Sequence, residues 1–310
     1  GWAVVDCGIA NDATRAHWEQ VFANSLDGLP VLRVLVTHMH PDHIGLAHWL
    51  CERWGRPADS TLPVFDDSQD CRLWISGTDY NAARLASQST TGFGGESAAA
   101  FMASHGLTDP DAVDKVRKRS NYYASMVPQV PARFRRLMGG DTLRIGDHDW
   151  ACHAGYGHAP EHISLHCAAL GVLVSGDMVL PRISTNVSVI DLEPEANPLP
   201  LYLASIGRML ALPAETLVLP SHGKPFRGLH TRVGQLVAHH DERFADLMAA
   251  CAQAPQTAAS LLPVLFRRPL DLHQTTFAMG EAIAHLHALW LRGELKRELG
   301  EDGVLRFSPA

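Results

Sequence analysis

The sequence lacks long hydrophobic runs, an excess of positive charge and closely spaced cysteine pairs. No stretch approaches the ~18 apolar residues that a membrane-spanning helix needs, so we expect no membrane association. The chain carries 26 Lys and Arg against 33 Asp and Glu, a net charge of −7, which makes nucleic acid an unfavourable partner. Its six cysteines form no CxxC pair, and we interpret them as reduced thiols of a cytoplasmic protein.

Length and composition are those of an ordinary globular protein. The 310 residues, of which 46% are hydrophobic, suffice for one large domain or for a domain with a small appendage. The opening GWAVVDCG resembles a strand already under way, so we expect natural residues upstream and no signal peptide. Histidine is abundant at 18 residues. A single histidine therefore carries little information, and only spacing is informative.

The stretch THMHPDHIG at 37–45 concentrates potential metal ligands in an HxHxDH motif. It follows VLRVLV (31–36), whose apolar, β-branched residues predict a buried strand. It precedes LAHWLCERW (46–54), which has helical spacing. Because Pro41 disfavours a smooth entry into a helix, we predict a loop at the carboxyl end of the strand. Ligands of α/β proteins collect at such strand ends.

The residue types in this motif suit divalent metals. Imidazole and carboxylate groups are good ligands for zinc and similar ions. His38 and His40 are two residues apart, so in an extended chain they point to one side. Asp42 and His43 can then turn to a second point. The spacing therefore favours two metal ions over one.

Three further predicted strands lead into residues of the same types. Strand-like WACHA (150–154) precedes His158, and the strand-like beginnings of GVLVSGDMVL (171–180) and TLVLPSHGKP (216–225) lead to Asp177 and His222 within the same stretches. His162 lies close to the first of these, and we interpret it as a neighbour of the site or a surface residue. A shared pattern of strand end and ligand is more specific than the first motif alone.

These motifs resemble those of the metallo-β-lactamase superfamily, in particular its glyoxalase II-like and lactonase-like members. The resemblance runs from VVDCG to PSHGKP and beyond. It implies an α/β fold, a four-layer αββα sandwich with two central sheets and helices on the outer faces. It also implies a ligand set, in which His38, His40 and His158 hold one metal ion, Asp42, His43 and His222 hold the second, and Asp177 bridges the two.

In that scheme Asp42 and Asp177 are the candidate catalytic residues, because they anchor the cations and orient a hydroxide. The expected cofactor is two Zn²⁺, with iron or manganese as alternatives, since the same ligands accept them. Asp6 of VVDCG matches the first motif of the family, where Cys7 replaces the usual threonine or serine. The resemblance gives Asp6 a supporting role, and capping of a turn is an equally good interpretation.

An insertion at about 81–138 separates the first ligand loop from the others and is predicted to consist of helices and loops, with helices at 96–107 and 109–127. Asp109 and Pro110 form a suitable helix start. Placed between ligand loops, the insertion can serve as a lid.

Two interpretations of the charge and aromatic residues near this lid stay open. Between 110 and 145 the chain has an excess of five positive charges, which form either a solvated helix face or a rim that attracts an anionic small-molecule substrate. Tyr122 and Tyr123 either wall a pocket or pack the lid. Arg182 and Asn186, in the loop after Asp177, are candidate substrate contacts.

The C-terminal tail has a different pattern. Apolar positions in 281–295 predict a helix that ends at Gly293, and 295–307 predicts a hairpin. Helix then hairpin resembles the winged-helix tail of one superfamily branch, which includes an endoribonuclease. From 230 to 310 the net charge is only −1, so we interpret the tail as a packing and homodimer element. The predicted domains are a catalytic domain at 1–230 and a winged-helix-like domain at 231–310.

The histidines scattered outside these motifs suggest no chemical role. His48, His153 and His166 lie in apolar patterns and are expected to pack. His105, His239 and His240 lie on polar stretches and carry no signal.

The leading functional prediction is a dinuclear zinc hydrolase that uses a metal-bound hydroxide to cleave a thioester, a lactone or another ester. The alternatives are an endoribonuclease or phosphodiesterase, suggested by the tail, and a β-lactamase. A non-enzymatic binder is disfavoured because the ligand set is complete. We expect a cytoplasmic protein with no membrane or nucleic-acid partner.

Overall fold

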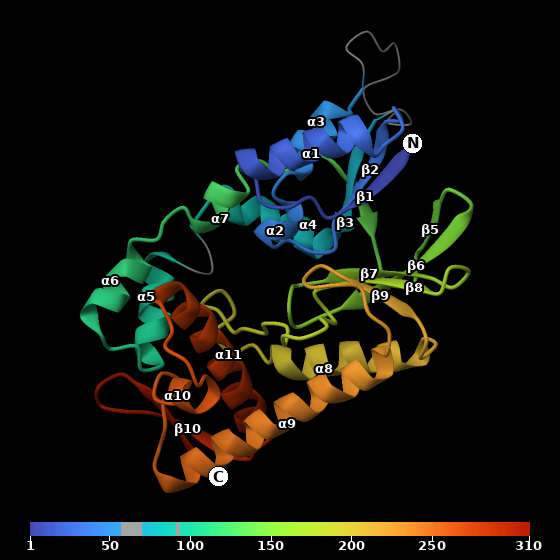
Figure 1. The fold of residues 1–310 in the computed structure, drawn as a ribbon. Coiled ribbons are helices and arrows are strands. Elements are labelled where there is room, and N and C mark those ends of the chain that lie inside the picture. The colour runs from blue at the N-terminus through green and yellow to red at the C-terminus, as the bar shows by residue number, and fades with distance from the viewer. Residues whose placement is uncertain (57–69, 91–93) are drawn as a thin grey trace. The chain divides into compact units, whose positions relative to one another are not determined.

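The computed structural model describes residues 1–56, 70–90 and 94–310 (Figure 1). The chain divides into two compact units. Unit 1 consists of Gly1–Ser89, Asn121–Ala154 and Ala159–Gly176, and unit 2 consists of Thr90–Ser120, Gly155–His158 and Asp177–Ala310. This division runs through several segments and differs from the predicted domain boundary at 230, which stays a prediction. Among the described helices, none combines the length and the hydropathy that a membrane crossing requires.

Unit 1 contains a parallel sheet whose strands lie in the order β1-β2-β3-β4. These strands span Trp2–Val5, Val31–Leu35, Arg72–Ser76 and Phe134–Leu137. Its second sheet places β5, β6, β7 and β8 side by side. They span Thr142–Ile145, His148–Gly155, His162–Cys167 and Val172–Gly176. The predicted strand at 31–36 is confirmed as β2, and the strand-like WACHA lies within β6.

Alternation along β2 explains how two cores form on opposite faces of the parallel sheet. Val34 is buried in a core with residues of α1 (Asp12–Asn24), α3 (Ala47–Arg53) and α4 (Gly77–Ala86). Its neighbour Leu35 faces the other way, into a core that includes Leu143, Cys152 and Ile163 of the second sheet. Unit 1 therefore consists of helices, a sheet and a second sheet in successive layers.

The predicted insertion is not a single body. Its first part, α4, packs on the parallel sheet, and residues 134–137 form β4 rather than a loop. Helix α5 (Gly95–Ser104) and helix α6 (Pro110–Arg117) belong to unit 2, whereas helix α7 (Tyr122–Met126) belongs to unit 1. The prediction that the insertion covers the metal ligands stays a prediction.

The helix predicted at 109–127 is broken into two, and that prediction is corrected. Asp109 caps α6 by accepting from the Asp111 N–H at 3.0 Å, as expected, with Pro110 in the first turn. The helix ends at Arg117, and Ser120 and the following asparagine interrupt it because short polar side chains favour non-helical backbone. Thr90 Oγ1 donates to the Ser120 carbonyl at 2.6 Å, which holds this break in place.

Unit 2 is largely helical. Its remaining elements are α8 (Pro198–Arg208), the 3₁₀ turn η1 (Met209–Ala211), β9 (Leu217–Pro220), α9 (Leu229–Gln253), α10 (Leu262–Leu265), α11 (Leu272–Leu291), β10 (Leu295–Leu299) and β11 (Leu305–Pro309). Helix α11 is buried on most of its surface and starts with a capping box formed by Asp271 and Gln274. Strands β10 and β11 pair antiparallel, so the predicted helix and hairpin of the tail are both present.

Candidate metal centre

The HxHxDH motif lies directly after β2, at the carboxyl end of the parallel sheet. His38 and His43 are fully buried, and His40 and Asp42 are partly buried. The segment is not a pure loop as predicted, because Pro41 starts the one-turn helix α2 (Pro41–Ile44). Proline is favoured at the first helical position, where its missing N–H costs nothing. The turn keeps His43 close to His38, with ring centroids 4.0 Å apart, whereas His40 and Asp42 belong to different ligand groups.

Asp6 supports this loop. Its carboxylate accepts from the Thr37 N–H at 2.8 Å, the Thr37 hydroxyl at 2.9 Å and His43 Nδ1 at 2.8 Å. Asp6 itself has a φ of 58°, a left-handed conformation that is unfavourable for a residue with a side chain. The supporting role implied for Asp6 therefore has a geometric basis, and Asp6 fixes which nitrogen of His43 carries its proton.

Asp79 is a second supporting carboxylate, and the sequence reasoning missed it. The side chain is fully buried near the start of α4. It accepts from the Met39 N–H at 2.8 Å and from the Glu161 N–H at 2.6 Å. Asp79 thus joins the loop of the HxHxDH motif to the loop that follows His158. The signal was present, because Ser76 and Asp79 form an S-x-x-D cap directly after the apolar stretch LWI that lies in β3.

Replacing Asp79 with alanine should lower the free energy of unfolding of the metal-free protein by about 3 kcal/mol, because two backbone N–H groups lose their fully buried, charged acceptor. Urea unfolding followed by circular dichroism measures this. Asp79→Asn keeps one acceptor and should lose less, and Asp147→Ala, at a fully exposed carboxylate, should have little effect. A loss at Asp79→Ala below about 0.5 kcal/mol would contradict this role.

Two further residues, Tyr123 and His162, contact the first loop. Tyr123 is buried, and its hydroxyl donates to the Met39 carbonyl, so its ring packs in unit 1 and its polar atom is occupied by backbone. His162 is fully buried, with its ring centroid 5.0 Å from that of His38 in a stacked arrangement. It is a neighbour of the site, as one of the two interpretations had it, and not a surface residue.

The other three candidate ligands, His158, Asp177 and His222, lie close together in unit 2. His158 lies just past β6, Asp177 directly follows β8, and His222 lies just past β9. Asp177 Oδ2 is 3.3 Å from His158 Nε2 and 3.5 Å from His222 Nε2. The opposite nitrogen of His158, Nδ1, is 2.7 Å from the Asn186 carbonyl. One carboxylate oxygen thus lies between two imidazole nitrogens.

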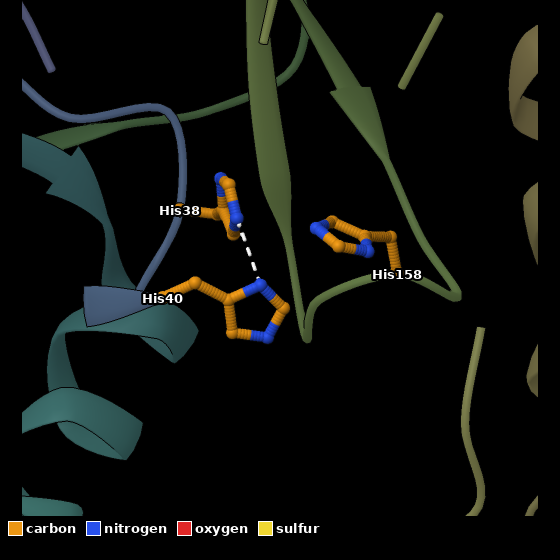
Figure 2. Close-up of side chains that lie close together, drawn as sticks. All are labelled: His38, His40 and His158. Atoms are coloured by element: carbon orange, nitrogen blue, oxygen red, sulfur yellow. Dashed lines mark hydrogen bonds between the residues drawn. The ribbon is translucent and has the colours of Figure 1, made fainter. Parts of the chain in front are cut away.

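Among the described residues, three groups bring ligand atoms within 4.8 Å of one another, as a metal ion requires. Figure 2 shows His38, His40 and His158 turned toward a common space. The groups are His38 with His40 and His158, His38 with His43 and Asp177, and Asp42 with His43 and His222. All seven predicted ligands are included, and His38 and His43 each belong to two groups.

The donor chemistry fits a divalent cation. A metal-binding histidine usually engages its second nitrogen with an oxygen, which fixes the tautomer. His38 Nδ1 lies 2.9 Å from the Thr37 hydroxyl, His43 Nδ1 is bound by Asp6, and His158 Nδ1 is bound by a carbonyl. Their Nε2 atoms are thereby directed to the ligand side, where the partners are imidazole and carboxylate, the ligands that zinc prefers.

The predicted substrate contacts are less well defined. Arg182 is exposed and Tyr122 is half-buried. The Asn186 side chain donates to Glu281 at 3.4 Å and accepts from Ser188 at 2.7 Å, so its polar atoms have protein partners. The substrate roles of these residues stay predictions.

The proposed cationic rim is divided between the two units and is partly neutralised within each. Arg117 lies 2.5 Å from Glu96 and 3.8 Å from Asp114. Lys118 also pairs with Asp114, at 2.5 Å. These contacts favour the solvated helix face for this part of the insertion.

Comparison with known proteins agrees with this geometry. The Metallo-beta-lactamase superfamily matches residues 1–60 and 82–222, and the family "Metallo-beta-lactamase-like, C-terminal domain" matches residues 244–310. The probable metallo-hydrolase YqjP of Bacillus subtilis (strain 168) is 26% identical over 297 residues, which are 92% of this chain and 83% of that protein.

Two crystal structures are similar over the whole chain. A beta-lactamase domain protein from Burkholderia ambifaria is 56% identical with a TM-score of 0.89, covering 100% of this chain and 84% of that one. A metallo-beta-lactamase family protein from Thermus thermophilus is 25% identical with a TM-score of 0.73, covering 99% and 89%. The predicted fold class is confirmed by these matches. The chain belongs to the metallo-beta-lactamase superfamily of metallohydrolases.

Proposed function

We propose that this protein is a dinuclear zinc hydrolase that cleaves a thioester, a lactone or another ester. The observation that carries the proposal is the position of Asp177 Oδ2, within 3.5 Å of both His158 Nε2 and His222 Nε2. These two histidines belong to different ligand groups. Asp177 would therefore help to hold both ions, and the HxHxDH motif would supply the other ligands. Iron and manganese accept the same ligands and are the alternative metals.

The chain's own residues supply the arrangement for hydrolysis. When bound, two divalent ions lower the pKa of water toward neutrality and polarise a carbonyl oxygen. Asp42 has a side chain that is 39% exposed, with Oδ2 3.4 Å from His43 Nε2. It can therefore accept a proton from the attacking water and return it to the leaving group. Water adds to the carbonyl carbon, the bond from that carbon to sulfur or oxygen breaks, and the thiol or alcohol takes the proton.

The substrate class is supported by fewer observations than the metal-dependent reaction. His222 is 43% exposed, so the proposed site has an edge that solvent can reach. Arg182, exposed in the loop after Asp177, favours a small substrate that carries a carboxylate or a phosphate. The net charge of −7 disfavours RNA. A winged-helix role for the tail, a homodimer and a cytoplasmic location belong to the same proposal and stay predictions.

A substrate panel tests this proposal. The zinc-loaded protein should hydrolyse a thioester or a lactone with kcat/KM at least ~100 times that for nitrocefin or for a short RNA. Nitrocefin turnover above that of every ester would favour a β-lactamase instead. RNA cleavage that weakens steeply with added salt would favour the endoribonuclease.

A further inference from the structure

Residues 185–189, here called the support segment, contact two of the candidate metal ligands within unit 2. The Thr185 hydroxyl donates to the backbone carbonyl of Asp177, and the Asn186 carbonyl accepts from His158 Nδ1 at 2.7 Å. Val187 and Val189 of the same segment are buried. Its conformation therefore determines both the orientation of the His158 ring and the course of the backbone at Asp177.

Helix α11 holds the support segment through two adjacent residues. The Val189 N–H donates to the Gly280 carbonyl at 3.1 Å. The Asn186 side-chain amide donates to Glu281 Oε2 at 3.4 Å, and its oxygen accepts from the Ser188 hydroxyl at 2.7 Å. A continuous set of contacts thus runs from α11 through Asn186 to a candidate metal ligand.

Gly280 has a specific steric reason to be glycine. A Cβ at this position would lie 2.7 Å from both Cβ and Oγ of Ser188 and 3.3 Å from the Val189 carbonyl. Glycine is unfavourable inside a helix, so its use here reflects the close approach of the support segment. Gly234, inside α9, has no atom within 4 Å of the same added carbon, and it provides a matched comparison.

Glu281 is the only acidic residue within α11, whose other residues are mainly apolar. Burial raises its pKa to about 7, and the hydrogen bond from Asn186 acts in the opposite direction. Keeping a carboxylate where burial opposes its charge is costly. The contact with Asn186 explains why a carboxylate is kept at Glu281. That contact restrains Asn186, whose carbonyl accepts from His158.

We propose that Gly280 and Glu281 are positioning residues for the metal centre, and that α11 acts on the His158 ligand group through the support segment. The inference rests on the proposed function, because it requires that His158 binds a metal ion. Helix α11 lies in residues 244–310, which match a separate C-terminal family, so the proposal makes this C-terminal part necessary for tight binding of one ion.

Zinc affinity of the full-length protein tests the proposal, measured by competition with a chromophoric chelator after metal removal. The variants are Glu281→Met, Glu281→Gln, Gly280→Ala and the control Gly234→Ala. Glu281→Met and Gly280→Ala should weaken one of two zinc ions by about 10- to 100-fold, the usual effect of residues that orient a ligand. Glu281→Gln keeps an acceptor for Asn186 and should stay within about threefold of wild type, as should Gly234→Ala.

Thermal unfolding of each metal-free variant separates positioning from loss of fold. The proposal expects Glu281→Met and Glu281→Gln to unfold at similar temperatures while differing in zinc affinity. Equal zinc affinity of Glu281→Met and wild type would overturn the proposal. Zinc affinities that fall in every variant only in proportion to the loss of metal-free stability would overturn it as well. A wild-type protein that binds no zinc would overturn the proposed function itself, and that result is visible before any variant is compared.

Discussion

Asp177→Asn should lose bound metal and hydrolytic activity together. The substitution keeps the size of the side chain but removes the charge of the one oxygen that lies within 3.5 Å of both His158 Nε2 and His222 Nε2. Residues that only orient a metal ligand typically cost 10–100-fold, so we expect a bridging ligand to cost more than about 100-fold in zinc affinity and in kcat/KM. Inductively coupled plasma mass spectrometry after gel filtration and an ester assay measure the two effects.

The fold should survive this change. Metal-free Asp177→Asn is expected to unfold within about 1 kcal/mol of the metal-free wild type, because the lost interactions are those of the site. Asp147→Asn, at a fully exposed carboxylate, should keep metal and activity. If the Asp177→Asn protein retains two zinc ions and full turnover, Asp177 is not a ligand of the metal centre.

The stability of the metal-free protein should fall steeply as the pH drops from about 6 to about 5. Unit 2 contains three histidines with no exposed surface, His240, His285 and His287, besides His105, which is 2% exposed. Burial lowers the pKa of His287 to about 4. It also lowers the pKa of His240 and His285, whose rings are in hydrogen-bond contact at 3.0 Å and therefore oppose each other's protonation.

The direction follows from proton linkage. Each of these histidines has a folded pKa below its unfolded value, so between about pH 6.5 and 4 the unfolded chain binds more protons and stability falls as the pH falls. Glu281, with its raised pKa of about 7, acts in the opposite direction, because the folded protein holds its proton from about pH 7 down to 4.5. For these three histidines and Glu281 alone the net difference is about two protons, or roughly 3 kcal/mol per pH unit, and the lowered pKa values of His105, His166 and His239 add to it.

Urea unfolding at several pH values measures this slope. His287→Asn keeps a donor for the Ala196 carbonyl, which His287 Nδ1 now contacts at 3.1 Å, and should reduce the slope by about one proton, or roughly 1.4 kcal/mol per pH unit. His17→Asn, at an exposed position, should leave it unchanged. A stability that is flat between pH 6.5 and 4.5 would show that these histidines are not neutral in the folded protein.

Most of the candidate metal ligands can be identified from local sequence patterns. The HxHxDH motif, His158, Asp177 and His222 each follow a recognisable strand, and strand ends are where α/β folds collect ligands. The sequence pattern alone does not show which of these loops supply ligands to the same metal ion. That assignment came from the family resemblance. The grouping of His43 with both Asp42 and Asp177 became evident only from the spatial arrangement.

The buried histidines show where local patterns mislead. His240 lies in the polar run AHHDERF, which predicts no role for it, yet it is fully buried. Helix α9 buries Val233, Leu236, Phe244 and Leu247 at spacings of three and four, and His240 falls on the same stripe. The periodicity over a longer window was therefore informative, whereas the polarity of the immediate neighbours was not.

The long-range contacts of a residue were not predictable from the sequence, even where a local pattern such as the S-x-x-D cap singles out the residue itself. Asp79 connects two loops that are more than a hundred residues apart, and a buried carboxylate can be assigned that role only when both N–H donors are located. Gly280 and Glu281 lie in a helix whose apolar pattern predicts packing. Their link to His158 depends on the path of residues 185–189, for which no sequence pattern gives a contact partner.

We propose that this chain hydrolyses its substrate with two divalent ions held by the seven candidate ligands. The most direct measurement is ester hydrolysis by one protein preparation, first metal-free and then titrated with Zn²⁺, with bound metal counted at each step. Activity should be lost on metal removal and should return as the second equivalent of zinc binds. Full activity in the metal-free protein, or a preparation that binds no zinc at all, would contradict the claim.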